Sequence, residues 1–161
     1  GLGIPAEPLF RSRDWFNNTL FVFVADHVSP ICYDPQSYTM QGHTSIIEFL
    51  YTPDGALRGL DNTIVQQLDI MPTVLGLVGN KEPYFAFGRD VFNEPERHPV
   101  AFNFINQVYQ YITDSTVFYS DAEKVLKTVK GEVQQKDENF LKAMLQQYAE
   151  RLGQRDYTVE E

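Results

Sequence analysis

A short apolar run that ends in a carboxylate and an imidazole is the feature of this sequence that most restricts its fold. Leu20–Ala25 is almost purely apolar and mostly β-branched or aromatic, and Asp26 and His27 follow it directly. A run of this length and composition predicts a strand buried on both faces, as in the parallel sheet of an α/β protein. Ligands gather at the carboxyl ends of strands in open parallel sheets, so Asp26 and His27 stand where chemistry is expected.

These two residues carry the donor atoms of a metal site. A carboxylate oxygen beside an imidazole nitrogen suits a divalent ion such as Mn²⁺ or Zn²⁺. The same pair also fits an aspartate that caps the following turn beside a solvated histidine. On their spacing alone, Asp26 and His27 leave both interpretations open.

The net charge restricts the partners of the chain. The 161 residues include 13 Lys and Arg against 22 Asp and Glu, a net charge of −9, which disfavours a surface that follows nucleic-acid phosphates. An anionic substrate stays compatible with this charge, because a bound metal supplies positive charge locally. Cys32 is the single cysteine, so no disulfide framework or cysteine-based zinc site is expected within the chain. No apolar run approaches transmembrane length, and we expect no signal peptide.

After His27 the sequence predicts a long loop and a second strand. Residues 28–43 form a long connection, which is typical of functional or mobile loops. Residues 46–51 predict a strand, and the Thr-Pro-Asp-Gly turn signal of residues 52–55 ends it.

Residues 69–79 predict a short helix. Asp69 is a suitable N-cap, and Gly79 can take the left-handed position after the last turn. Apolar residues surround most of this segment, so we expect the helix to be well buried.

From about residue 98 the pattern changes to short aromatic and β-branched runs, and we place a division of the chain between 1–97 and 98–161. The runs are separated by turn-length gaps, which predicts an antiparallel meander. Residues 122–130 fit either a helix or a fourth strand, and both stay open. Residues 137–152 form one apolar stripe and predict an amphipathic helix that lies on the sheet and is closed by Gly153. The meander runs cover residues 100–106, 108–113 and 116–120.

Taken in order, four motifs resemble the C-terminal part of sulfatase-like enzymes of the alkaline phosphatase superfamily. Within that superfamily the sequence is most similar to the lipoteichoic acid synthase group of phosphoglycerol transferases. The resemblance runs from about Asp14 to Asp90, and more loosely through the meander and last helix. It implies the C-terminal portion of an α/β/α sandwich, followed by a small antiparallel meander packed by a C-terminal helix. The motifs are Ala25-Asp26-His27, Thr52-Pro53-Asp54-Gly55, Gln66–Leu75 and Phe85–Asp90.

The resemblance implies that Asp26 and His27 are two of the metal ligands. In the family an acidic residue and a threonine nucleophile complete the site, and the resemblance places both N-terminal to Gly1. No catalytic residue is therefore expected in this chain, which we interpret as a C-terminal fragment that is inactive alone. The metal implied is Mn²⁺, with Zn²⁺, Mg²⁺ and Ca²⁺ as alternatives.

The resemblance also implies a reaction and a location. The whole enzyme would transfer or hydrolyse phosphoglycerol-type phosphodiesters through a covalent intermediate on the upstream threonine. Its partners would be the missing N-terminal part of the domain and a phospholipid head group or a sulfate or phosphate ester. It would be anchored in a bacterial cytoplasmic membrane, with this domain on the outer side. The alternatives are a sulfate ester hydrolase with a Cys or Ser nucleophile and a non-catalytic binding or assembly module. An exposed sheet edge would favour dimerisation.

Several other polar or aromatic residues are interpreted as structural. His43 is expected to be an ordinary loop histidine and His98 a solvated one, and Arg58 and Arg89 are expected at the surface. Alternating aromatic residues in a meander are usually core residues rather than a stacking surface. The cluster comprises Tyr109, Tyr111, Phe118 and Tyr119.

Overall fold

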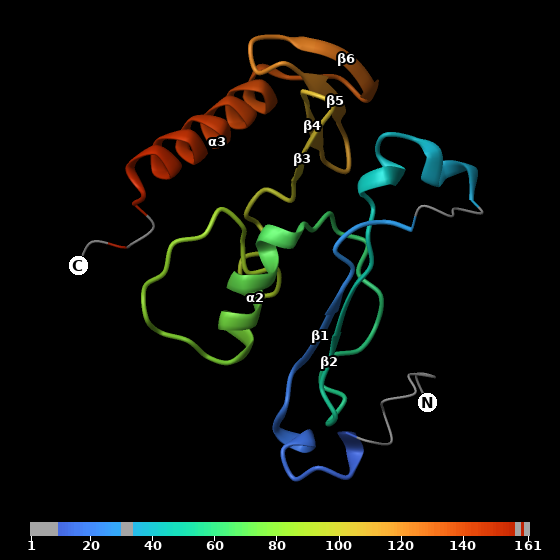
Figure 1. Cartoon of the computed structure of the whole chain (residues 1–161), viewed down its shortest axis with the longest axis vertical. Coiled ribbons are helices and arrows are strands. Elements are labelled where there is room, and N and C mark those ends of the chain that lie inside the picture. The colour runs from blue at the N-terminus through green and yellow to red at the C-terminus, as the bar shows by residue number, and fades with distance from the viewer. Residues whose placement is uncertain (1–9, 30–33, 157–158, 160–161) are drawn as a thin grey trace. The chain divides into compact units, whose positions relative to one another are not determined.

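The computed structural model describes residues 10–29, 34–156 and 159. The chain forms two compact units, Gly1–Asp61 and Asn62–Glu161, and each unit is described by itself (Figure 1). The division predicted after residue 97 is a different partition and stays a prediction. In the part of the chain that the structure describes, no helix is long and apolar enough to cross a membrane.

The first unit is built on a two-stranded antiparallel sheet. β1 (Phe21–Val24) pairs with β2 (Glu48–Tyr51), and Phe21 lies opposite Tyr51. The prediction that this strand is buried on both faces in a parallel sheet was therefore wrong, because Val24 at its end remains 41% exposed. A parallel partner needs a crossover, usually a helix. The described residues between the strands form only the short 3₁₀ turns η2 (Pro35–Tyr38) and η3 (Gly42–Thr44).

Aromatic rings cover one face of this sheet. Phe21 and Phe23 share a face because they are two residues apart in a strand, and both contact rings of β2. The centroid of Phe21 lies 5.7 Å from that of Tyr51, and Phe23 lies 5.7 Å from Phe49. Phe16 from the 3₁₀ turn η1 (Phe16–Asn18) packs 5.5 Å from Phe21 and is the buried centre of the group.

The second unit begins with the 3₁₀ turn η4 (Gln67–Asp69), which continues into α2 (Ile70–Leu77). Asp69 stands at the predicted N-cap position of α2, but its side chain makes no capping hydrogen bond to that helix, whereas Gly79 has the predicted left-handed backbone at φ 75°. The expectation of a well-buried helix was wrong. Pro72 and Thr73 are the buried residues of α2, whereas Met71 is 47% exposed. The rest of the second unit covers only one face of this helix. Apolar side chains on the other faces of the helix therefore stay partly exposed.

The predicted meander is confirmed, and it has four strands. The strands pair antiparallel in the order β3-β4-β5-β6. Asn106 and Gln107 both have positive φ, as a two-residue hairpin turn requires. Residues 125–130 form a strand because the Asp121 carboxylate accepts from the backbone N–H groups of Glu123 and Lys124 and closes a turn. The bounds are β3 (Ala101–Ile105), β4 (Val108–Ile112), β5 (Val117–Ser120) and β6 (Val125–Lys130).

α3 (Gln135–Gln154) packs on the meander as predicted, and it is longer than predicted at both ends. Gln134 and Asp137 form a capping box at its start. Gly153 lies inside the helix, and Arg155 takes the left-handed position at its end, with φ 55°.

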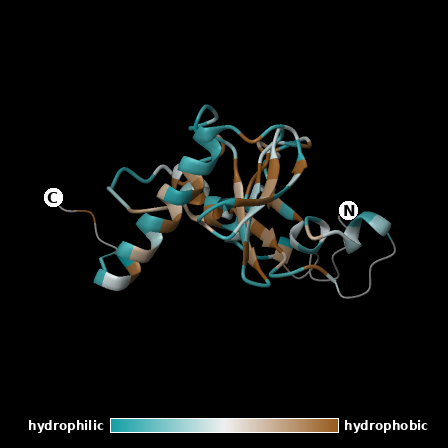
Figure 2. Ribbon diagram, turned by 90° about the horizontal axis from the view of Figure 1, so that it is seen from above, coloured by the Kyte–Doolittle hydropathy of each residue, from teal (hydrophilic) through white to brown (hydrophobic). Residues whose placement is uncertain are grey.

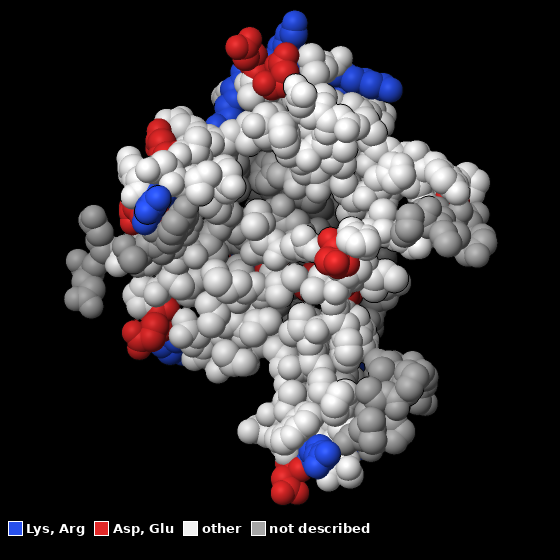
Figure 3. Space-filling model, in the orientation of Figure 1, with Lys and Arg blue, Asp and Glu red and all other residues white. Residues whose placement is uncertain are grey.

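Figure 2 shows hydrophobic residues along the meander strands and hydrophilic residues over much of α3. In Figure 3, Lys and Arg side chains lie over the meander, with Asp and Glu side chains beside them. The buried core comprises Val100, Tyr111, Phe118 and Leu141.

Candidate metal site

Asp26 and His27 lie together directly after β1. The Asp26 Oδ1 atom accepts the backbone N–H of His27 over 2.9 Å, which holds the carboxylate beside the imidazole. His27 Nδ1 lies 2.8 Å from the Val28 carbonyl oxygen. A carbonyl oxygen only accepts, so Nδ1 carries the proton and Nε2 of the neutral ring carries the lone pair. This is the arrangement that metal-binding histidines adopt.

The two donor atoms have a separation that suits one ion. His27 Nε2 lies 3.7 Å from Asp26 Oδ2. Two ligands at about 2.1 Å from a tetrahedral ion are roughly 3.4 Å apart, so a small adjustment brings both onto one metal. The two side chains are 75% and 89% exposed for His27 and Asp26 respectively, so an ion can approach them. The hydrogen bond to Val28 and then the Asp26 charge raise the pKa of His27.

Asp26 and His27 are two candidate ligands, which is half of the number that a four-coordinate ion needs. No group of three or more His, Cys, Asp or Glu side chains among the described residues could hold a metal ion. His43 lies in η3, where its backbone N–H donates to the Thr39 carbonyl. Cys32 lies outside the described residues. Asp26 and His27 therefore fit a metal in donor type and spacing, and a complete site needs further ligands.

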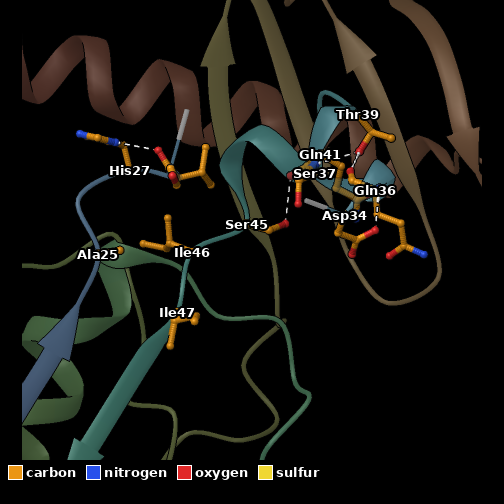
Figure 4. Close-up of a pocket in the computed structure, with 13 residues that line it drawn as sticks. Ala25, His27, Asp34, Gln36, Ser37, Thr39, Gln41, Ser45, Ile46 and Ile47 are labelled. Atoms are coloured by element: carbon orange, nitrogen blue, oxygen red, sulfur yellow. Dashed lines mark hydrogen bonds between the residues drawn. The ribbon is translucent and has the colours of Figure 1, made fainter. Parts of the chain in front are cut away.

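A pocket of about 840 Å³ opens beside His27 within the first unit (Figure 4). η2, η3 and the residues that precede β2 form most of its wall. The sequence indicated only that the connection over residues 28–43 was long, and its many Ser, Thr and Gln residues were the signal of a polar wall. The lining residues are Ala25, His27, Val28, Ser29, Asp34, Gln36, Ser37, Thr39, Gln41, Gly42, Ser45, Ile46 and Ile47.

His98 is exposed, as predicted for a solvated histidine, but its side chain also has a partner. Its Nε2 atom lies 2.7 Å from the Tyr111 hydroxyl oxygen, and that hydroxyl donates to Asp137 Oδ1 over 3.2 Å. Because the hydroxyl proton goes to the carboxylate, His98 donates Nε2–H to the phenol oxygen. Burial, followed by the Asp137 charge, raises the pKa of Tyr111. This chain of hydrogen bonds ties β4 to the start of α3.

Arg89 is buried rather than at the surface as predicted. It is 4% exposed, and its guanidinium donates to the backbone carbonyls of Glu94 and Ile64 over 3.4 and 3.3 Å. The expectation that Tyr111 and Phe118 are core residues is confirmed, because both are fully buried. The second unit thus contains a packed core and a buried polar network.

The chain is similar in sequence to lipoteichoic acid synthases over part of its length. No family model matches it. It is 33% identical over 78 residues to lipoteichoic acid synthase from Staphylococcus aureus strains USA300 and NCTC 8325. That similarity covers 46% of this chain and 12% of the synthase, so the chain spans a small part of these curated relatives.

The fold is similar to part of a longer solved structure. A protein in the alkaline phosphatase superfamily from Vibrio parahaemolyticus matches with a TM-score of 0.77 and 20% identity. The match covers 96% of this chain and 40% of that protein. The chain therefore has the fold of part of an alkaline phosphatase superfamily protein, with a partial sequence similarity to lipoteichoic acid synthase.

Proposed function

We propose that this chain carries two ligands of the metal centre of an enzyme that transfers or hydrolyses phosphoglycerol-type phosphodiesters. The observation that carries the proposal is the 3.7 Å separation of His27 Nε2 and Asp26 Oδ2 after a strand of this fold. The threonine nucleophile and the other ligands come from residues outside this chain. A sulfate ester is the alternative substrate, because the same two ligands serve either reaction.

In the proposed site the chain holds and orients the two ligands. The Val28 carbonyl fixes the His27 ring with Nε2 outward, and the His27 backbone N–H fixes one Asp26 oxygen. The metal, when bound, would stabilise negative charge on the nucleophile and the transferred group. A carboxylate and an imidazole fit Mn²⁺ or Zn²⁺ better than Mg²⁺ or Ca²⁺, which prefer oxygen ligands alone.

The likeness to lipoteichoic acid synthase supports two further parts of the proposal. The substrate would be a phospholipid head group, and the domain would lie on the outer side of a bacterial cytoplasmic membrane. The rest of the catalytic domain would be its partner.

A Mn²⁺ titration followed by NMR tests the ligand assignment, because a paramagnetic ion broadens nearby signals even when it binds weakly. We expect broadening centred on Asp26 and His27, and its loss in Asp26→Ala and His27→Ala. His43→Ala is the matched control and keeps the broadening. Broadening centred elsewhere, or unchanged in both variants, would contradict the assignment.

Activity assays test the location of the nucleophile. With Mn²⁺ present, we expect the 161-residue chain to hydrolyse neither bis(4-nitrophenyl) phosphate nor 4-nitrophenyl sulfate. Metal-dependent turnover that disappears in Asp26→Ala would show that the chain completes its own site.

An assembly module is the second candidate function, and the aromatic face of the first unit favours it. Phe23 and Phe49 are 40% and 37% exposed on that face. The four strand residues of the face are uncharged: Phe21, Phe23, Phe49 and Tyr51. Two copies of an acidic chain meet with least repulsion over such a face. Light scattering after size exclusion would show a concentration-dependent dimer that Phe23→Lys abolishes. A monomer at all concentrations would exclude this function.

A further inference from the structure

The pocket beside His27 has a wall that is built before any ligand arrives. Thr39 Oγ1 donates to the Gln36 carbonyl over 2.8 Å and accepts the Gly42 N–H over 2.9 Å, which joins η2 to η3. A Cβ atom on Gly42 would lie 2.2 Å from the Gln36 carbonyl oxygen, so only glycine permits this approach. Ser45 Oγ donates to the Gln41 carbonyl over 2.9 Å. The hydroxyl protons of Thr39 and Ser45 are thus used within the wall.

Three other polar side chains of the pocket have no partner within the described part of the chain. They are the carboxamides of Gln36 and Gln41 and the hydroxyl of Ser37, and each can both donate and accept. Asp34 Oδ1 accepts the Gln36 N–H over 3.0 Å, and Asp34 is itself a lining residue of the pocket. Figure 4 shows Asp34, Gln36 and Ser37 on the wall across from His27.

The charge and size of the pocket define the ligand further. Among the lining residues that the structure describes there is no Lys or Arg, and Asp34 is the one carboxylate. An anionic ligand would lack a cationic partner there and would face the Asp34 charge. Ile46 and Ile47 supply an apolar part of the lining. The pocket volume of about 840 Å³ lies within the range of about 300–1,000 Å³ that is usual for small-molecule sites. A pocket of this size has room for a ligand much larger than glycerol.

We propose that this pocket binds an uncharged, hydroxyl-rich ligand of saccharide size. Ring hydroxyls pair with the carboxamides of Gln36 and Gln41 and with the Asp34 carboxylate, which can accept from two neighbouring hydroxyls. The C–H groups of the sugar pack on Ile46 and Ile47. The binding itself is independent of the metal. One part of this inference rests on the proposed function: the sugar would be the alcohol portion of an ester that is held beside His27.

NMR titration of the ¹⁵N-labelled chain with glucose and maltose tests the proposal. The buffer contains EDTA, so the result does not depend on the proposed metal ligands. We expect millimolar binding, tighter for maltose, with amide shifts confined to residues 34–47 that the structure describes. The double variant Gln36→Ala/Gln41→Ala should weaken binding by at least about tenfold, since two hydrogen-bonding groups are lost. Gln146→Ala, on the exposed side of α3, is the matched control and leaves binding unchanged.

Glucose 6-phosphate tests the exclusion of anions. We expect it to bind at least several-fold more weakly than glucose, and Asp34→Asn should reduce that difference. Asn keeps an oxygen for the Gln36 N–H, so this variant removes the charge and retains the cap. No shifts with 50 mM maltose, unchanged affinity in the double variant, or tighter binding of glucose 6-phosphate would each overturn the proposal. Failure of the Mn²⁺ titration alone would leave this inference standing, because the two experiments probe different residues.

Discussion

The Asp69 carboxylate accepts the backbone N–H of Arg89 over 2.8 Å, and this bond joins the start of α2 to a segment 20 residues later. The other carboxylate oxygen accepts the backbone N–H of Gln66 over 3.1 Å. One buried side chain therefore satisfies two backbone donors from separate segments. Burial raises the pKa of Asp69, although the two hydrogen bonds oppose that effect.

Replacing Asp69 by Asn should destabilise the second unit by about 1–3 kcal/mol. The amide keeps the shape, but its NH₂ group faces one of the two backbone donors and leaves that donor unsatisfied. Urea unfolding followed by circular dichroism measures the change. Glu82→Gln, at an exposed position, is the control and should change the unfolding free energy by less than about 0.5 kcal/mol. Equal midpoints for Asp69→Asn and the wild type would contradict the bridging role.

Tyr111→Phe should also destabilise the fold at neutral pH, by about 1.5–3 kcal/mol. The substitution removes the hydrogen bond to the buried Asp137 carboxylate, and bonds to charged groups are worth about this much. Thermal unfolding monitored by calorimetry checks it. Tyr38→Phe, at a 63% exposed site, should leave the melting temperature nearly unchanged.

The same variant should change the response to alkaline pH. The pKa of Tyr111 is raised in the folded state above its ordinary value of 10. Above pH 10 the unfolded chain loses this proton while the folded chain keeps it. The contribution of Tyr111 is therefore full below pH 10 and falls by up to about 1.4 kcal/mol per pH unit above it. Unfolding free energies at pH 9, 10 and 11 should converge for wild type and Tyr111→Phe, and a constant difference would contradict the shift.

Two glycines should respond oppositely to alanine. A Cβ atom on Gly88 would lie 2.0 Å from the Leu68 carbonyl oxygen, so Gly88→Ala must displace the backbone of η4 and is expected to destabilise by at least about 1–3 kcal/mol. Nothing lies within 4 Å of a Cβ atom on Gly153 inside α3. Gly153→Ala should stabilise by up to about 1 kcal/mol. Chemical unfolding of both variants under one set of conditions measures the pair, and the same sign for both would contradict the structural explanation.

Leu141→Ala should cost about 2–5 kcal/mol, because Leu141 is 2% exposed where α3 meets the meander. Leu152 is 52% exposed on the same helix, so Leu152→Ala should cost less than about 1 kcal/mol. Hydrogen exchange would also show faster opening of α3 in the Leu141 variant alone. A loss of unfolding free energy in Leu152→Ala but not in Leu141→Ala would contradict this prediction and would indicate that the other face of α3 is packed.

Local sequence patterns correctly predicted the meander and α3, because the formation of these elements depends mainly on residues close together in the chain. The meander follows from short alternating runs, and α3 follows from a stripe of apolar residues at helical spacing. The end of α3 was wrong because Arg155, rather than Gly153, takes the left-handed conformation. Residues 122–130 stayed open because Ser120–Glu123 fits a helix cap and a turn equally well, and the pairing of β6 with β5 decides between them.

The sequence by itself determined that a carboxylate and an imidazole follow an apolar strand, and the donor types of the candidate site depend on nothing else. Only the tertiary structure decided the direction of the partner strand, the burial of Arg89 and the partners of His98. It also brought Gln36 and Gln41 to one pocket wall through the Gly42 contact. The strand direction and the surroundings of Arg89 and His98 depend on contacts between segments that are separated in the chain. The Gly42 contact is a close approach of two neighbouring turns. In neither case does a local pattern encode which groups meet.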